Sequence, residues 1–277
     1  MADKSSIEWT DATWNPVIGC SKVSPGCAHC YAEALTMRFA TTWKVPGLPW
    51  TPANAAANVI LRPERLEQPL RWATPRMVFV NSMSDLFHEM VPDEYIAKVF
   101  AVMAVASQHV FQILTKRPER MATLLNSAAW ETLLDAAAAY VGQDLDPSSA
   151  LPNVWLGTSI ENRRFVSRGD ALRDTPAAVR FVSAEPLLGP LLPDFDLRGV
   201  DWLIVGGESG HRHRPMRIEW VRELREASAE AGTAFFFKQW GGRTPKTNGR
   251  TIDGRTWDEL PEPHPRAGRE AALLLTA

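Results

Sequence analysis

The sequence lacks any long hydrophobic run and any excess of charge of one sign. No stretch of about 18 apolar residues, the length that spans a membrane, occurs in the 277 residues. Residues 1–4 are followed by no apolar secretion segment, so we expect a cytoplasmic protein that does not associate with membranes. The 30 basic and 32 acidic side chains leave a formal net charge of −2. This balance argues against wholesale coating of nucleic acid but allows a local basic cleft.

Internal repeats, coiled-coil heptads and a glycine-rich dinucleotide turn are also absent from the sequence. Hydrophobic residues make up 45% of the chain and charged residues 22%, which excludes an intrinsically disordered composition. A chain of this length can bury a large core and needs no disulfide bonds to hold it.

Cysteine is scarce and unevenly placed. The chain has three cysteines, Cys20, Cys27 and Cys30, and all of them fall within eleven residues. An odd number in a reducing compartment cannot form a complete disulfide framework, and scattered core cysteines would not cluster in this way. A bound metal ion or cluster is the economical explanation.

Six short apolar runs predict buried parallel strands, because they are continuous rather than alternating in polarity. The runs are 77–81, 110–115, 154–159, 179–184, 202–207 and 234–239. Helical patterns lie between them at 62–72, 93–107, 117–139, 161–173 and 218–231. The alternation of strand and helix predicts an α/β fold, namely a partial (β/α)6-type TIM barrel with right-handed crossovers.

The barrel is expected to occupy residues 1–240, with a cysteine loop at 14–31. Residues 41–60 are rich in Pro, Ala and Trp and predict a long ordered excursion after that loop. Residues 241–277 are polar and rich in Gly and Pro, which predicts a covering strap with a loose terminus.

Polar and charged residues follow nearly every predicted strand. They lie at 82–88, 116–120, 161–164, 185 and 208–214. Functional groups collected at the carboxyl ends of many strands are typical of TIM-type barrels. Any one of these segments is better explained as a solvated loop, but five segments with the same pattern favour a shared site.

The cysteines have the spacing C-x6-C-x2-C. Gly19, Pro25 and Gly26 allow the backbone to curl, so that three thiolates can converge. With His29 they would form a structural Cys₃His zinc site, although chelation by both His29 and the adjacent Cys30 is awkward. Three thiolates without a fourth ligand suit a [4Fe–4S] cluster with one open iron.

The residues around the cysteines resemble the radical S-adenosylmethionine (SAM) superfamily. Segments 15–20 and 26–32 look like the cluster loop of the branch that contains spore photoproduct lyase. Segments 82–85 (SMSD) and 114–117 (LTKR) resemble that branch's Ser/Thr-x-Ser/Thr-Asp and Thr-Lys elements, and both lie at strand ends. Over residues 7–260 the chain is most similar to an uncharacterised phage-associated radical-SAM-like family.

The resemblance implies two cofactors and their ligands. It assigns the [4Fe–4S] cluster to Cys20, Cys27 and Cys30, and SAM to a site lined by Ser84, Asp85 and Lys116. Lys116 would pair with the SAM carboxylate. The implied activity is reductive cleavage of SAM to a 5′-deoxyadenosyl radical, with electrons from an external flavodoxin- or ferredoxin-type donor.

Several positions depart from the pattern. The first cysteine gap has three extra residues, and His29 stands where the superfamily has an aromatic residue. Met83 stands where the lyase has a hydrogen-donating cysteine, so the lyase's DNA repair reaction is not implied. Gly206-Gly207-Glu208 resembles an element that contacts the SAM amine, but it follows the fifth predicted strand. A simple tight turn explains these glycines equally well.

Cationic side chains gather at three predicted strand ends. They are Lys116, Arg117, Arg163, Arg164, His211, Arg212, His213 and Arg214. Together they would form a basic patch suited to phosphate or carboxylate groups. The phage association of the resembling family and its likeness to a DNA repair lyase imply a nucleic-acid substrate. Salt bridges to nearby acids are the alternative explanation for each arginine taken alone.

Trp9, Trp14 and Trp240 flank turns or the cysteine loop, and we expect them to shield the cluster or to stack a base. The sequence as a whole favours a radical SAM-type enzyme that acts on a nucleic acid or nucleotide. The alternative is a non-enzymatic zinc- or cluster-stabilised nucleic-acid-binding protein that uses the same cysteines.

Overall fold

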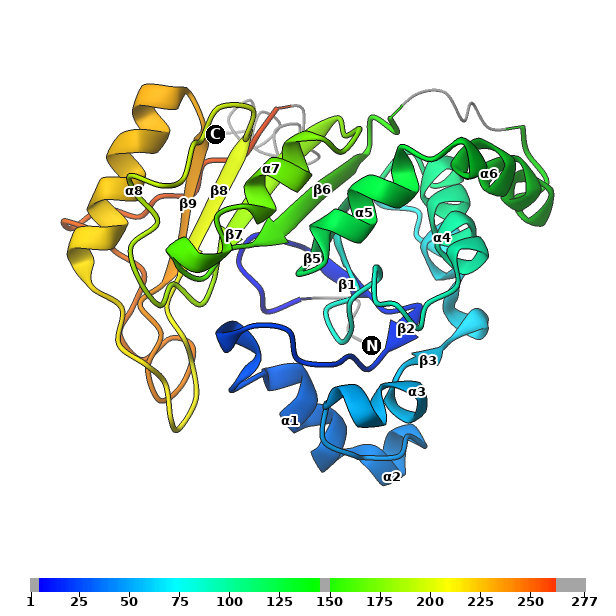
Figure 1. Cartoon of the computed structure of the whole chain (residues 1–277), viewed down its shortest axis with the longest axis horizontal. Helices are drawn as coiled ribbons and strands as arrows, with labels where there is room; N and C mark the ends of the chain where they lie inside the picture. Colours follow the sequence, from blue (N-terminus) through cyan, green and yellow to red (C-terminus); the bar gives the residue numbers. More distant parts are fainter. Residues whose placement is uncertain (1–4, 145–149, 263–277) are drawn as a thin grey trace.

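Seven parallel strands form one curled sheet in the computed structural model, which describes residues 5–144 and 150–262 (Figure 1). The strands are β1 (Ala12–Trp14), β4 (Met77–Val80), β5 (Val110–Thr115), β6 (Val154–Ser159), β7 (Val179–Ala184), β8 (Trp202–Gly206) and β9 (Ala234–Gln239). They lie side by side in chain order, so β1 and β9 are the two edges of an open half-barrel.

Six of these strands confirm the apolar runs of the sequence to within one residue. The strand count was wrong by one, because β1 pairs with β4 in register Ala12 to Val78 and Trp14 to Val80. A strand of three residues is too short to show a pattern of its own. β1 is instead held by its hydrogen bonds to the side of β4 that faces away from β5.

Five helices cover the convex face of the sheet (Figure 1). They are α4 (Asp93–Val105), α5 (Pro118–Leu125), α6 (Ala128–Val141), α7 (Arg168–Arg173) and α8 (Ile218–Ala231). The helices predicted at 93–107 and 218–231 are confirmed by α4 and α8.

The other predicted helices need correction. The segment 62–72 forms two short 3₁₀ turns, each with a proline in its first two positions. The segment 117–139 is broken into α5 and α6 by Asn126 and Ser127, and 161–173 is a 3₁₀ turn followed by α7. The structure describes every residue between β7 and β8, and none of them is helical. The alternation of strand and helix is therefore not a regular (β/α)6 repeat.

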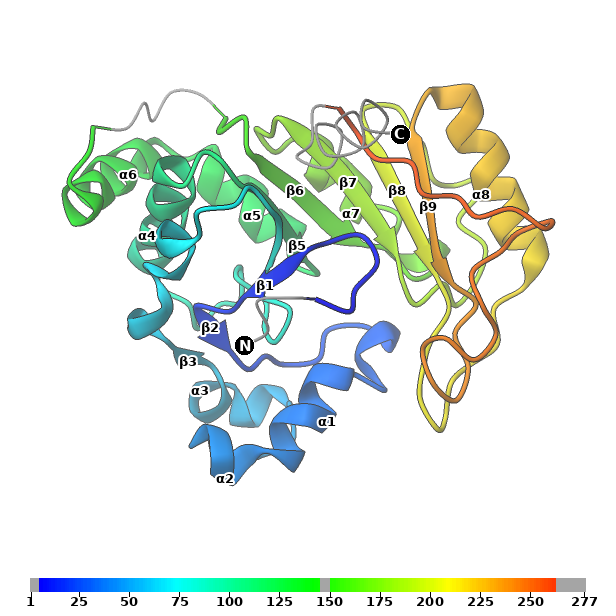
Figure 2. The same ribbon diagram turned by 180° about the vertical axis from the view of Figure 1, so that it is seen from behind.

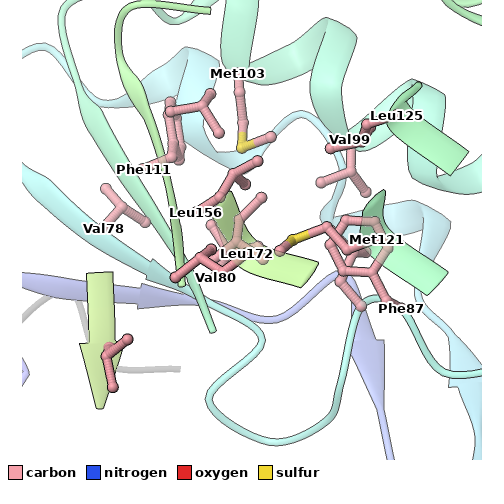
Figure 3. Close-up of a cluster of buried hydrophobic side chains, with 14 of the residues drawn as sticks. Val78, Val80, Phe87, Val99, Met103, Phe111, Met121, Leu125, Leu156 and Leu172 are labelled. Atoms are coloured by element: carbon pink, nitrogen blue, oxygen red, sulfur yellow. The ribbon is translucent and has the colours of Figure 1, made fainter. Parts of the chain in front are cut away.

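The core has two layers, one on each face of the sheet, because strand side chains alternate between faces. Val78, Val80 and Phe111 point outward and pack against helix residues such as Val99 and Met103 (Figure 3). The inner layer is aromatic: Trp9, Phe79, Trp155, Phe181, Trp202 and Phe236. The rings of Trp9 and Trp202 lie 6.0 Å apart at 86°, an edge-to-face contact.

The inner layer fills the amino-terminal half of the barrel. Its members include Met77 and Trp202, which are the first residues of β4 and β8. Trp9 and Trp14 are 2% and 0% exposed and belong to the core, so neither ring is free to stack a base as the sequence suggested. We call the opposite end of the half-barrel, at the carboxyl ends of the strands, the mouth.

The cysteine loop begins an excursion that is closed by a small second sheet. In this sheet β2 (Val17–Ile18) pairs antiparallel with β3 (Ile60–Leu61). The excursion carries α1 (Tyr31–Arg38), α2 (Ala40–Trp43) and α3 (Ala55–Asn58). These three short helices lie together on one side of the molecule in both views (Figures 1 and 2).

The chain after β9 runs back along the sheet edge. Asp258 forms an antiparallel bridge with Phe236, and the Trp202 indole donates to the carbonyl of Glu259 at 2.9 Å. Residues 263–277 of the expected tail lie outside the described residues. Among the described helices, none has both the length and the apolar character needed to cross a membrane.

Candidate functional site

Three glutamates follow neighbouring strands at the mouth. Glu161 follows β6, Glu185 follows β7 and Glu208 follows β8. Each lies an even number of residues beyond an inner aromatic residue of its own strand, so alternation directs all three toward the concave face. Parity along the strands therefore places an acidic row above the aromatic layer.

The cysteine loop lies across this row. Ser24 Oγ donates to Glu161 Oε1 at 2.5 Å, and His29 Nδ1 lies 3.1 Å from Glu208 Oε2. A Cβ on Gly26 would lie 2.4 Å from Glu161 Oε1, so a side chain at this position would displace the glutamate. The loop is thus attached at two points to strands that come more than a hundred residues later.

The first cysteine is held by a buried arginine. Arg117 is 9% exposed and donates to Asp85 Oδ2 and to Ser21 Oγ, both at 3.0 Å. Its guanidinium also lies 3.6 Å from Cys20 Sγ. Asp85 in turn accepts from the Thr115 hydroxyl at 2.6 Å. This network connects the ends of β4 and β5 to Cys20.

The three thiols lie in one electrostatic neighbourhood. Burial raises the pKa of Cys20 to about 12 and also raises the pKa of Cys30, and negative charge on Cys27 contributes to both shifts. A bound cation would lower these pKa values, because it stabilises thiolates. In the described residues, no three Cys, His, Asp or Glu side chains already surround a common metal position. Thiolates are the usual ligands of iron–sulfur clusters, so the donor chemistry of this loop fits such a cluster.

The residues predicted to line a SAM site are engaged to different degrees. Ser84 Oγ donates to the Val17 carbonyl at 2.9 Å, and Asp85 is occupied by Arg117 and Thr115. Lys116 Nζ lies 3.7 Å from Glu161 Oε1 with its side chain 21% exposed. Of the three predicted residues, Lys116 is the one with donors to spare at the mouth.

The Gly206-Gly207-Glu208 element has a packing explanation. A Cβ on Gly207 would lie 2.0 Å from the Trp240 carbonyl, and one on Gly206 would lie 3.2 Å from the Glu185 side chain. Burial alone would raise the pKa of Glu208, but hydrogen bonds from Arg214 and His29 outweigh it and lower the pKa to about 2. Glu208 therefore stays charged while it holds Arg214.

The predicted cations separate into two groups. Four of the eight contact acidic groups of the protein. Lys116 lies near Glu161 and Arg117 near Asp85. Arg214 pairs with Glu208 and donates to the Pro25 carbonyl at 2.9 Å, and Arg163 lies 3.1 Å from Asp194. The second group is exposed, and its side chains have no acidic partner in the described part of the chain: Arg164, His211, Arg212 and His213. The structure does not bring all eight predicted cations into one patch.

Two residue pairs at the mouth were missed in the sequence. Lys238 Nζ reaches across β8 to Glu185 Oε1 at 2.6 Å. The sequence did contain a signal for the first pair: Lys238 lies two residues after the inward-facing Phe236 in a mostly apolar strand. His88 is completely buried and lies 2.8 Å from Ser21 Oγ, and burial followed by the charge of Arg117 lowers its pKa to about 4.

A comparison with protein families gives one match, to the family described as "Protein of unknown function (DUF5131)", over residues 4–261. The chain belongs to this family. No curated protein matches the chain. The DUF5131 match covers the sheet, the cysteine loop and the mouth, and its description names no activity.

Proposed function

We propose that this DUF5131 protein binds a [4Fe–4S] cluster through Cys20, Cys27 and Cys30 and acts as a radical SAM-type enzyme. The observation that carries the proposal is the position of the cysteine loop. All three cysteines of the chain lie on one loop that is hydrogen-bonded across the mouth of a parallel half-barrel. When bound, the cluster and SAM would supply a 5′-deoxyadenosyl radical for hydrogen abstraction.

Arg117 would position the first ligand. Its guanidinium is fixed by Asp85 and faces Cys20 Sγ from 3.6 Å. Hydrogen bonds to ligand sulfur stabilise negative charge there and tune the reduction potential of a cluster. We therefore assign Arg117 to the support of the cysteine loop rather than to substrate binding.

Lys116 and the Glu185–Lys238 pair would bind the polar groups that enter the mouth. Lys116 offers a cation to a carboxylate such as that of SAM, at the cost of its 3.7 Å contact with Glu161. Glu161 would remain compensated, because Arg168 donates to its other oxygen at 3.2 Å. Glu185 and Lys238 supply one acceptor and one donor beside the open end of β8.

The aromatic layer would serve the same chemistry by excluding water from below. Phe181 and Trp202 are fully buried under the mouth, and the cysteine loop covers part of it from above. Radical chemistry needs such exclusion because solvent-derived side reactions compete with hydrogen transfer to the substrate.

The test is anaerobic reconstitution with iron and sulfide, followed by reduction with dithionite in the presence of SAM. We expect a brown protein with about four irons per chain that forms 5′-deoxyadenosine. Cys27→Ser should lose most of the iron. Lys116→Met should keep the iron and weaken SAM binding about tenfold or more, as loss of a charged contact does. Lys98→Met, on helix α4, is the matched control and should change neither value.

Two outcomes would contradict the proposal. A colourless protein with one zinc per chain would support the zinc-stabilised binding protein instead. A full cluster without 5′-deoxyadenosine, under conditions where a known radical SAM enzyme forms it, would exclude the radical SAM activity.

A further inference from the structure

Two loops beside the mouth form one structural unit. Residues 209–217 follow β8 and residues 241–252 follow β9, and we call them the basic loops. The Gly210 amide donates to the Gly242 carbonyl at 2.9 Å, and Ser209 forms a parallel bridge with Gly242. The two loops extend together past the ends of their strands in both views (Figures 1 and 2).

The basic loops contain no acidic residue. The first holds three arginines and two histidines, and the second holds Arg243, Lys246 and Arg250. This is a strong local bias in a chain whose formal net charge is −2. Such a bias is typical of a surface that attracts a polyanion.

Only part of this charge is neutralised by the protein itself. Arg214 pairs with Glu208 and Arg250 with Asp258. His211, Arg212 and Arg243 are exposed and have no acidic partner among the described residues. Lys246 lies 3.5 Å from Glu8 with its side chain 75% exposed, a surface contact that holds it weakly. Cations therefore face solvent from both loops.

Neutral donors lie among these cations. Thr244, Thr247 and Asn248 are exposed in the second loop. Hydroxyls, amides and backbone N–H groups, together with Arg and Lys, are the groups that contact phosphate and sugar in nucleic-acid complexes. None of the exposed large hydrophobic side chains of the described residues lies in either loop, so the apolar anchor of a membrane-binding surface is missing.

We propose that the basic loops bind the phosphate backbone of a nucleic acid. The surface adjoins the mouth, because Arg214 of the first loop donates to the Pro25 carbonyl of the cysteine loop. A strand held on the basic loops would therefore pass beside the cysteines. Binding itself does not rest on the proposed cluster; only the further conclusion that nucleic acid is the substrate does.

The experiment measures binding of fluorescein-labelled 20-nucleotide DNA and RNA strands by anisotropy, at several salt concentrations, without SAM. Arg212→Ala/Arg243→Ala should weaken binding at least tenfold in about 50 mM salt. Each lost phosphate contact removes about 0.7 from the log–log salt slope for a single strand, so the double variant should lose about 1.4. Its thermal unfolding should match that of the unmutated protein.

Arg71→Ala/Lys98→Ala is the matched control, since it removes the same charge from exposed or half-exposed positions away from the mouth. Its affinity and salt slope should stay close to those of the unmutated protein. The proposal is overturned if the unmutated protein binds no strand at 50 mM salt, if the two double variants lose affinity equally, or if only anionic phospholipid vesicles bind. Iron content, measured on the same samples, separates this result from failure of the cluster.

Discussion

Both sides of the mouth carry arginines, but one side has a buried and paired arginine, whereas the other has exposed arginines without acidic partners among the described residues. On the side of β4 and β5, Arg117 is buried, bound to Asp85 and in contact with Cys20. On the side of β8 and β9, Arg212 and Arg243 are exposed and have no acidic partner among the described residues. The first side holds the loop in place, and the second side has charge left to bind something else.

This difference shows why arginines at strand ends cannot be treated as one set. A guanidinium whose donors are used by buried acids has no capacity for a ligand, and its removal leaves an uncompensated charge. A guanidinium in water contributes little to stability and keeps its full charge for a partner. Stability and binding measurements should therefore separate the two sides.

The largest effect is expected on the buried side. Arg117→Met leaves Asp85 charged and without its ion-pair partner in a buried position, which typically costs about 3–5 kcal/mol of unfolding free energy. Denaturant titration of the metal-free protein measures this loss. Asp85→Asn combined with Arg117→Met should recover part of it. A loss below about 1 kcal/mol would show that the pair does not hold this side together.

The next effect is a pH dependence of the same network. Burial and Arg117 lower the pKa of His88 to about 4 in the folded protein, below its ordinary value of 6.5. The unfolded chain thus binds the proton more tightly, and stability falls as pH drops from about 6.5 to 4. The His88 contribution is up to about 3 kcal/mol. Denaturation at a series of pH values should show this fall, and His88→Gln should flatten it. The exposed His211→Gln is the control, and an equal flattening there would refute the assignment.

The smallest effect is expected on the exposed side. Arg212→Ala removes a side chain without a buried contact or an acidic partner in the described structure, so the unfolding free energy should change by less than about 0.5 kcal/mol. The same denaturant titration measures it. A loss comparable to that of Arg117→Met would show that Arg212 is held by the protein and is not available to bind a ligand.

Much of the sheet could be read from local patterns. The run 110–115 and the helical pattern 218–231 match β5 and α8 residue for residue. Continuous β-branched and aromatic runs predict buried strands, and apolar residues at helical spacing predict helices, because the spacing of the apolar residues follows the period of each element. β1 left no such signal, since three residues are too few, and Pro63 and Pro69 turned an apparent helix into 3₁₀ turns.

The site was predictable in its parts but not in its connections. The sequence alone determines that three thiols share one short loop and that polar residues follow most strands. It does not determine which acid meets which base. Arg214 and the Pro25 carbonyl are 189 residues apart, and Arg117 and Asp85 are 32 apart. The pairing of β4 with β5 brings Asp85 and Arg117 together, and the path of the cysteine loop across the mouth brings Pro25 to Arg214. Burial then decides their roles, because a charge out of water must find a partner inside the protein, while a charge in water remains available to a ligand.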